Sequence, residues 1–280
     1  MSVKFVCMGK FNDKRVLITG GASGIGRIMG AMSLEKGAAA LIIWDINQAN
    51  IDSTVAELTT KGRVFGYRVD VSDDKMVKQA YEKVKAEVGQ VDILINCAGI
   101  VMSNKTFDCC TTEEIYRTMN INAIAPMVVA LQVLPDMIAN NSGHICNIAS
   151  AGGMIANPRM SIYAASKWAA IGWSDSVRIE LKERHSKVRI TTIAPYYITT
   201  GMFDGVQSRV LPLLKPHYAA KQIIRAIEKN NNFKVLMRWI PFPEHFIRLM
   251  QGILPSSWFD WIFGQVFGIY HTMDNFTGRK

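Results

Sequence analysis

Short, continuously apolar runs alternate with longer amphipathic stretches along most of the chain. The apolar runs predict about seven strands, at residues 15–19, 41–44, 64–69, 92–95, 144–148, 188–193 and 234–238. The stretches between them predict a helix that ends near residue 36 and further helices at 47–60, 73–88, 112–140 and 161–183. Strands that are apolar throughout and alternate with helices are buried on both faces, so we expect an α/β protein with a doubly wound parallel sheet.

The sheet pattern is followed by a segment of different character, residues 239–280. It is rich in aromatic residues and predicts two helical pieces separated by Pro255, neither with an apolar run long enough to cross a bilayer. Because the chain shows no internal repeat and no low-complexity linker, we expect residues 1–280 to form a single domain, with 239–280 as its C-terminal helical extension. The longest predicted helix, 112–140, contains Pro126, and we expect it to bend there.

The charge of the chain is unevenly placed. The net charge is +9, and from Lys182 onward there are 14 Lys and Arg against 6 Asp and Glu. Such an excess suits an anionic membrane surface, and it equally serves solubility alone. No basic run is interleaved with aromatic residues that could stack on bases, so we expect no nucleic-acid partner.

Cysteine and histidine usage indicates a reducing compartment and no metal. The five cysteines are odd in number and form no C-x-x-C pair, and two of them lie in apolar runs that look like buried strands. The five histidines show no metal-ligand spacing. Residues 1–14 contain only a short apolar patch at 3–8. We therefore expect a cytoplasmic protein without signal peptide or transmembrane helix, and contact with a membrane surface through 239–280 stays open.

A glycine-rich turn follows the first predicted strand and leads directly into a helix. It reads TGGASGIG over residues 19–26, with the spacing G-x-x-x-G-x-G. Glycines let the backbone turn tightly and approach a pyrophosphate, and a helix N-terminus favours negative charge. We expect this turn to bind a dinucleotide through Gly20, Ser23, Gly24, Ile25 and Gly26.

Polar residues at the ends of the next strands extend this predicted site. Asp45 follows the second strand, 19 residues beyond Gly26, where a carboxylate accepts hydrogen bonds from the adenosine ribose. A 2′-phosphate would meet like charge there and Ile46 offers no cation, so we expect NAD rather than NADP. The alternative is that Asp45 only caps the following helix. Further residues that we expect to contact the cofactor lie at the ends of the third and fourth strands: Asp70, Val71, Asn96, Ala98 and Gly99. Together these features predict a Rossmann-type sheet.

A second group of polar residues suggests acid/base chemistry at the same sheet edge. Tyr163 and Lys167 are four residues apart on one predicted helix and therefore share a face, while Ser150 ends the preceding strand. A phenol titrates near pH 10, and a nearby ammonium lowers that pKa. The phenolate could then take the proton of an alcohol while hydride leaves for a nicotinamide, with Ser150 holding the oxygen. A Tyr and a Lys that share a face by chance are the alternative.

With these motifs the sequence resembles the short-chain dehydrogenase/reductase family over about residues 14–202. The resemblance is carried by TGGASGIG, NCAG, the Asn of MNINA, the Ser of NIASAGG, and YAASK. It implies that Ser150, Tyr163 and Lys167 are catalytic, and that Tyr163 and Lys167 also contact the cofactor. It adds Asn120, whose main chain in such enzymes holds a water that links the lysine to solvent. Asn122 is a nearby competitor for this position.

The segment after the sixth predicted strand departs from the family pattern at one position. Pro195, Ile198, Thr200 and Met202 match residues that contact the cofactor in the family, but Tyr196 replaces the usual glycine. The stretch PYYITTGMFDG, with LPLLKPHYAAKQII downstream, resembles a subgroup that includes membrane-associated retinol dehydrogenases and some 17β-hydroxysteroid dehydrogenases.

These observations predict an NAD(H)-dependent oxidoreductase that interconverts a hydrophobic alcohol, such as a retinoid, steroid or long-chain alcohol, and its carbonyl. A 3-oxoacyl thioester reductase and a non-catalytic NAD-binding scaffold on the same fold are the alternatives. The aromatic extension either packs on the domain or lies on a membrane. Helix 161–183 carries apolar residues on more than one face, at Trp168, Ile171, Trp173, Val177 and Ile179, so we expect a homodimer or homotetramer.

Overall fold

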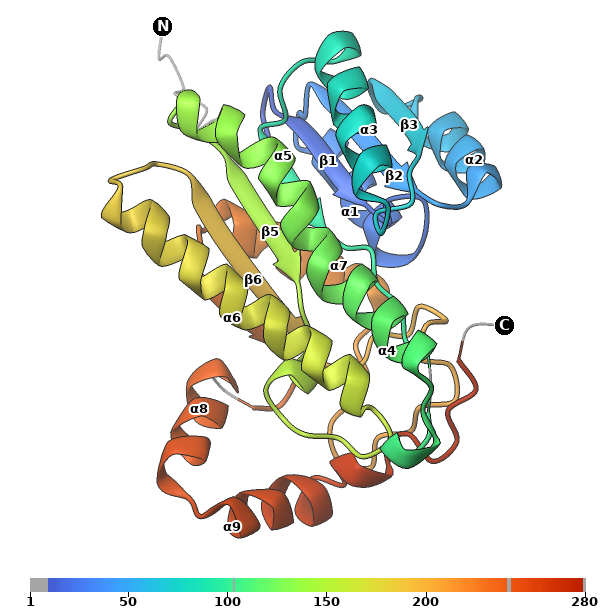
Figure 1. Ribbon diagram of the computed structural model, residues 1–280, viewed down its shortest axis with the longest axis vertical. Coiled ribbons are helices and arrows are strands. Elements are labelled where there is room, and N and C mark those ends of the chain that lie inside the picture. The colour runs from blue at the N-terminus through green and yellow to red at the C-terminus, as the bar shows by residue number, and fades with distance from the viewer. Residues whose placement is uncertain (1–9, 103, 241–242, 279–280) are drawn as a thin grey trace, which may run out of the picture.

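Seven strands form one parallel sheet in the order β3-β2-β1-β4-β5-β6-β7 (Figure 1). They are β1 (Arg15–Thr19), β2 (Ala40–Asp45), β3 (Val64–Arg68), β4 (Ile93–Asn96), β5 (His144–Ile148), β6 (Arg189–Pro195) and β7 (Phe233–Leu236). This is a computed structural model that describes residues 10–102, 104–240 and 243–278. The predicted doubly wound parallel sheet is confirmed. The apolar patch at 3–8 lies outside the described residues.

Helices cover both faces of this sheet. One face carries α1 (Gly24–Glu35), α2 (Gln48–Leu58) and α7 (Pro216–Glu228), and the other carries α3 (Asp74–Glu87), α5 (Ala125–Ala139) and α6 (Ser161–Glu183). Within β1, Val16 and Ile18 join the core on the first face while Leu17 joins the core on the second. Because both faces are buried, the strands read as uninterrupted apolar runs.

The chain reverses its direction across the sheet between β1 and β4. It adds β2 and β3 on one side of β1, then returns to place β4, β5, β6 and β7 on the other. The segments that follow β1 and β4 therefore diverge at the carboxyl ends of two neighbouring strands. In open α/β sheets this divergence leaves the crevice in which ligands bind.

The predicted helix 112–140 is interrupted just before the expected place. Residues Thr112–Met119 form α4, Asn120–Ile124 form one π-helical turn, and α5 begins at Ala125. Pro126 has no N–H to donate to the carbonyl of Asn122, and the Ala125 amide bonds to the Asn120 carbonyl, five residues back. The irregular turn therefore lies just before Pro126, near which the sequence predicted a bend.

The combined stretch 112–139 is long and apolar enough to cross a membrane by length and composition. Its position identifies it as a core helix instead. Val129, Val133 and Met137 of α5 are buried against the sheet and α3, in the core of that face. The same test of length and composition is passed by many buried helices, so this stretch carries no membrane assignment.

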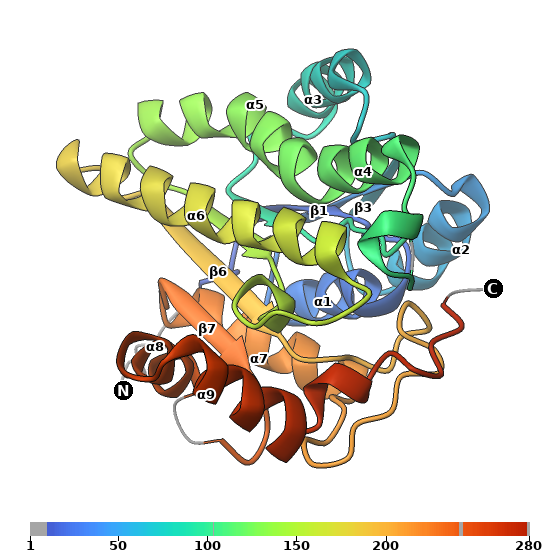
Figure 2. The same ribbon diagram turned by 60° about the horizontal axis from the view of Figure 1, so that its bottom comes forward.

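The C-terminal extension is helical and begins beside β7 (Figure 2). It comprises α8 (Pro243–Ile253), α9 (Ser256–Trp261), a π-helical turn (Ile262–Val266) and a 3₁₀ turn (Ile269–His271), and Pro255 separates α8 from α9 as predicted. Ile247, Phe259 and Phe263 are buried, with the Phe259 and Phe263 ring centroids 4.3 Å apart. One side of the aromatic stripe thus packs on the protein.

The other side of the extension faces outward. Leu249, Ile253, Trp258 and Trp261 are each more than half exposed.

Candidate active site

A cavity of about 320 Å³ opens at the carboxyl ends of the strands, where the strand order reverses. Its wall is built from the segments that follow all seven strands, together with the start of α6 and one residue of the C-terminal extension. All but one of the residues predicted to bind the cofactor line it: Gly20, Ser23, Gly24, Ile25, Gly26, Asp45, Ile46, Asp70, Val71, Ala98, Gly99, Tyr163, Lys167, Pro195, Ile198, Thr200 and Met202. The residues that the sequence places at this edge of the sheet therefore surround a cavity.

The glycine turn takes a conformation that requires glycine. Gly20 and Gly24 have φ of +66° and +52°, values that side chains rarely adopt. A Cβ on Gly26 would lie 2.2 Å from the Gly20 carbonyl oxygen, so only hydrogen lets α1 start this close to the turn. The residues present fit a dinucleotide: the turn brings bare backbone to the cavity wall, and the positive end of α1 favours a pyrophosphate.

Asp45 connects the end of β2 to this turn. Its carboxylate accepts hydrogen bonds from the backbone amides of Ala22 and Asn47, each at 3.1 Å. The cap of α2 is Asn47, whose side chain accepts from the Asn50 amide, so the alternative that Asp45 merely caps this helix is wrong. Asp45 is instead fixed at the cavity wall by two amides, and Ile46 beside it is 59% exposed.

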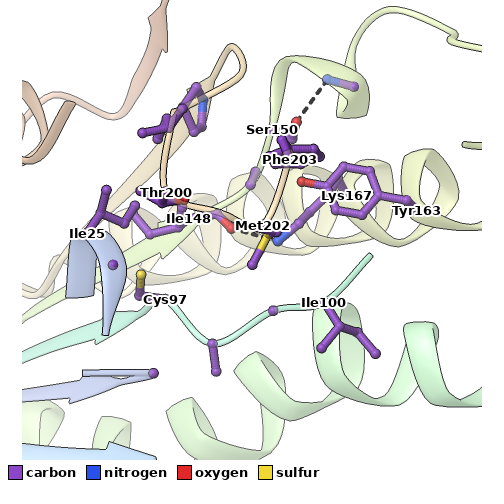
Figure 3. A pocket seen from close by; sticks show the side chains of 18 of the residues that line it. Ile25, Cys97, Ile100, Ile148, Ser150, Tyr163, Lys167, Thr200, Met202 and Phe203 are labelled. Atoms are coloured by element: carbon purple, nitrogen blue, oxygen red, sulfur yellow. Dashed lines mark hydrogen bonds between the residues drawn. The ribbon is translucent and has the colours of Figure 1, made fainter. Parts of the chain in front are cut away.

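Ser150, Tyr163 and Lys167 come together on the opposite wall (Figure 3). Tyr163 and Lys167 lie on the first turns of α6 and are both buried. Ser150 caps the 3₁₀ turn Ala151–Gly153, where its Oγ accepts from the Gly152 amide at 3.1 Å. The Ser150 side chain lies close enough to Tyr163 to lower the pKa of its phenol. The Lys167 Nζ donates to the Ile148 carbonyl at 2.9 Å and lies 5.7 Å from the centroid of the Tyr163 ring.

Burial is the main influence on the pKa values of Tyr163 and Lys167. It raises the pKa of Tyr163 to about 12, against the opposing effect of the Ser150 side chain. It also lowers the pKa of Lys167 to about 8. The sequence predicted the reverse for the phenol, because the lysine was expected to stabilise its anion. In the structure the loss of hydration has the largest effect on the pKa of Tyr163, and it favours the neutral phenol.

Two predicted site residues lie away from the cavity wall. Asn96 donates its amide to the side chain of Asn147 at 2.9 Å and to the Pro126 carbonyl at 3.3 Å, so it ties β4 to β5 and α5. The Asn120 carbonyl accepts the Ala125 amide inside the π-helical turn. The side chain of Asn122, the competitor, binds the backbone of Ile100 and the hydroxyl of Ser166. The water-holding role expected for Asn120 stays a prediction.

A further part of the cavity wall, called the second compartment below, consists of residues that the sequence did not assign to the cofactor or to acid/base chemistry. It includes Ile155, Asn157, Met160, Tyr196, Tyr197, Phe203, Met237 and Ile269. These residues come from the turn after β5, the segments after β6 and β7, and the C-terminal extension. In the part of the chain that the structure describes, no group of three or more His, Cys, Asp or Glu side chains is placed to hold a metal ion.

The fold and the cavity define the class of Rossmann-type oxidoreductases with a Ser, Tyr and Lys at the sheet edge. The chain belongs to the short-chain dehydrogenase family, because residues 14–210 match the family described as short chain dehydrogenase.

Similar proteins agree with this assignment. Epidermal retinol dehydrogenase 2 of Mus musculus is 35% identical over 271 residues, covering 95% of this chain and 85% of that protein. Estradiol 17-beta-dehydrogenase 11 of Homo sapiens is 32% identical over 243 residues, covering 86% and 79%. The crystal structure of a short chain dehydrogenase/reductase from Burkholderia phymatum in complex with NAD shares the fold with a TM-score of 0.78 at 23% identity, covering 88% of this chain and 95% of that chain.

Proposed function

We propose that the protein is an NAD(H)-dependent oxidoreductase that interconverts a hydrophobic alcohol and its carbonyl, with Tyr163 as the acid/base. The observation that carries this proposal is the placement of Ser150, Tyr163 and Lys167 in the wall of one cavity that also contains the glycine turn. A substrate oxygen beside the Ser150 and Tyr163 hydroxyls can be held by one and exchange a proton with the other.

Each side chain then has a defined task. A bound nicotinamide supplies the hydride donor or acceptor. In carbonyl reduction the neutral Tyr163 phenol donates its proton to the substrate oxygen as the carbon receives hydride, and the carbonyl becomes a hydroxyl. In alcohol oxidation the phenolate accepts the hydroxyl proton. Lys167 holds positive charge behind the phenolate, and Ser150 donates a hydrogen bond to the developing alkoxide.

The preference for NAD rests on Asp45. Its carboxylate is held at the cavity wall by two backbone amides and cannot easily swing away. A ribose with free hydroxyls can donate to it, whereas a 2′-phosphate would place two like charges together.

The substrate class rests on the walls of the second compartment and on the named relatives. Met160, Phe203, Met237 and Ile269 present apolar surface to the substrate end of the cavity. Two relatives are named for retinol and estradiol, both bulky hydrophobic alcohols. A retinoid, a steroid or a long-chain alcohol therefore suits this compartment better than a short polar one.

The test measures NADH formation from retinol, steroid alcohols, long-chain alcohols and 2-propanol. The same alcohols are then assayed with NADP. Oxidation of NADPH by a 3-oxoacyl thioester tests the reductase alternative. We expect turnover of a bulky alcohol with NAD. Tyr163→Phe should lower kcat by about 10²–10⁴-fold while NADH binding, followed by fluorescence, stays unchanged. Preference for 2-propanol would contradict the substrate class. Unchanged biological activity in Tyr163→Phe would favour the scaffold alternative instead.

A further inference from the structure

The Tyr163 ring packs in a small apolar cluster whose buried members belong to neither of the two cores on the faces of the sheet. Those buried members are Met160, Tyr163, Val206 and Met273. The partly buried side chains of Val101, Tyr197, Phe203, Leu213 and Phe276 pack against them. All of these residues together are called the tyrosine cluster below. Because Met273 and Phe276 belong to the C-terminal extension, the extension supplies part of the packing around Tyr163.

Met273 is the most deeply buried member of the tyrosine cluster. It is 1% exposed and lies outside the cavity wall, whereas Tyr163 and Phe203 are both part of that wall. The rings of Phe203 and Tyr163 make an edge contact, with their centroids 6.0 Å apart. The Met273 side chain can therefore affect a bound substrate only through other members of the cluster.

The backbone around Met273 is fastened to the segments that carry the rest of the cluster. The Met273 carbonyl accepts a hydrogen bond from Asn104 Nδ2 at 2.7 Å. A Cβ on Gly205 would lie 2.0 Å from the Asn275 carbonyl oxygen, so the extension and the segment after β6 are in close backbone contact. These contacts hold Met273 against the segment that carries Phe203.

From this geometry we infer that Met273 is a positioning residue, which holds Tyr163 and Phe203 in the arrangement that the reaction requires while lying outside the cavity itself. This inference rests on the proposed function and adds a residue to it. Proton transfer needs two oxygens within hydrogen-bond reach, so the packing around a reacting side chain must hold it to within about 0.5 Å. The same packing contributes to the burial that raises the pKa of Tyr163 to about 12.

The test replaces Met273 by alanine and by leucine. Met273→Ala opens a space in the tyrosine cluster, so the Tyr163 ring gains freedom and water gains access to it. We expect kcat for a bulky alcohol with NAD to fall by at least about tenfold, while KM for NAD changes by less than about twofold. Met273→Leu keeps the apolar volume and should retain kcat within about twofold. An unchanged kcat in Met273→Ala overturns the inference.

Ile247→Ala is the matched control for a loss of stability. Ile247 is also fully buried and belongs to the extension, but it packs in the core on the face of the sheet that carries α1. Both alanine variants should lower the melting temperature, and only Met273→Ala should lower kcat. An equal fall of kcat in Ile247→Ala overturns the inference. Met273→Val removes less volume and gives the same comparison if Met273→Ala does not fold.

A titration of the phenol tests the role of Met273 without turnover. Phenolate absorbance is measured as the difference between each protein and the same protein with Tyr163→Phe, and circular dichroism checks that both stay folded. With a pKa of about 12, about a tenth of Tyr163 should be ionised at pH 11 in the unaltered protein. In Met273→Ala the fraction should rise to about half, because water reaches the ring.

The titratable groups around the ring, Lys167 on α6 and Tyr197 after β6, are present in all of these proteins. Equal ionisation in the unaltered protein and in Met273→Ala overturns the inference. Increased ionisation in a protein that oxidises no alcohol would sustain the role of Met273 at Tyr163 and remove the proposed function. Oxidation of a bulky alcohol that is equally fast in Met273→Ala would do the reverse.

Discussion

Asp45 is the single residue on which the choice between the two dinucleotides depends. Asp45→Asn removes the charge and keeps the size, so repulsion of a 2′-phosphate disappears. We expect the ratio of kcat/KM with NAD to that with NADP to fall by at least about tenfold, which corresponds to about 1.4 kcal/mol. Steady-state rates with both cofactors measure it. Asp52→Asn, an exposed position on α2, is the control and should leave the ratio unchanged.

Lys167 makes the free energy of unfolding depend on pH, and the direction of this dependence follows from its lowered pKa. Burial lowers its pKa from 10.5 to about 8 in the folded chain, so the unfolded chain binds more protons between these values. The cost of burying the charge is therefore present below pH 8 and is relieved as the pH rises above it.

The prediction compares the protein with Lys167→Met, in which this titration is absent. From pH 8 to pH 10 the free energy of unfolding of the unaltered protein should rise by about 2 kcal/mol relative to the variant. Urea unfolding at several pH values measures the difference. A difference that stays constant over this range, or that moves in favour of the variant, would mean that Lys167 is not a buried cation.

At the scale of elements, the start of α1 depends on the absence of a side chain at Gly26. Gly26→Ala forces its Cβ against the Gly20 carbonyl, so the turn or the helix must shift. We expect a loss of stability of about 1–3 kcal/mol together with weaker NADH binding. Thermal unfolding and a fluorescence titration measure the two effects.

Gly252→Ala supplies the matched control for this substitution. A Cβ on Gly252, near the end of α8, meets nothing within 4 Å among the described residues. This variant should keep NADH binding and gain up to about 1 kcal/mol. Equal effects of the two substitutions would refute the role given to the glycine turn.

The elements of the sheet could be predicted because each strand is apolar on two faces and bounded by polar turns. Predicted and observed strand ends differ by no more than two residues. The glycine turn, Asp45 and the pair of Tyr163 and Lys167 were also accessible, because their geometry depends on local spacing along one strand or helix.

Other features depend on tertiary contacts, which the spacing of residues along the sequence does not encode. The π-helical turn precedes Pro126 because the bond that a proline lacks is to a carbonyl four residues earlier. The raised pKa of Tyr163 depends on how completely the fold buries it. Asn157 and Thr272 meet only because the C-terminal extension returns to the cavity, and no periodicity records that return.

At the scale of the whole molecule, we propose that the outward side of the extension contacts a membrane surface. Trp258 and Trp261 are 64% and 62% exposed, and Ile253 beside them is 70% exposed. Tryptophan and aliphatic side chains on an amphipathic helix insert at the boundary between headgroups and acyl chains. Trp258→Gln with Trp261→Gln should lower co-sedimentation with phosphatidylserine-containing vesicles several-fold, since both anchors are removed.

We propose that a different apolar surface, on α5 and α6, contacts a second copy of the chain. Leu131 is 67% exposed and Trp168 is 50% exposed, and the two helices lie side by side on one face of the sheet. Leu131→Gln with Trp168→Gln should shift the protein from a dimer or tetramer toward the monomer in light scattering.

The two double variants serve as controls for each other. The tryptophan variant should keep its assembly state, and the α5–α6 variant should keep its binding to vesicles. Loss of both properties in either variant would show that the two surfaces are not independent.

The docking of the C-terminal extension against the segment after β6 has a consequence for the order in which the protein folds. Residues 272–278 reach back to the segment after β6: the Gln207 amide bonds to the Thr272 carbonyl, and the Thr277 amide bonds to the Asp204 carbonyl. These residues follow every strand in the chain, so they leave the ribosome after the whole sheet has been synthesised. A nascent chain can therefore assemble its sheet during translation, while the wall of the cavity is completed only once the late segment that carries Ile269 has docked.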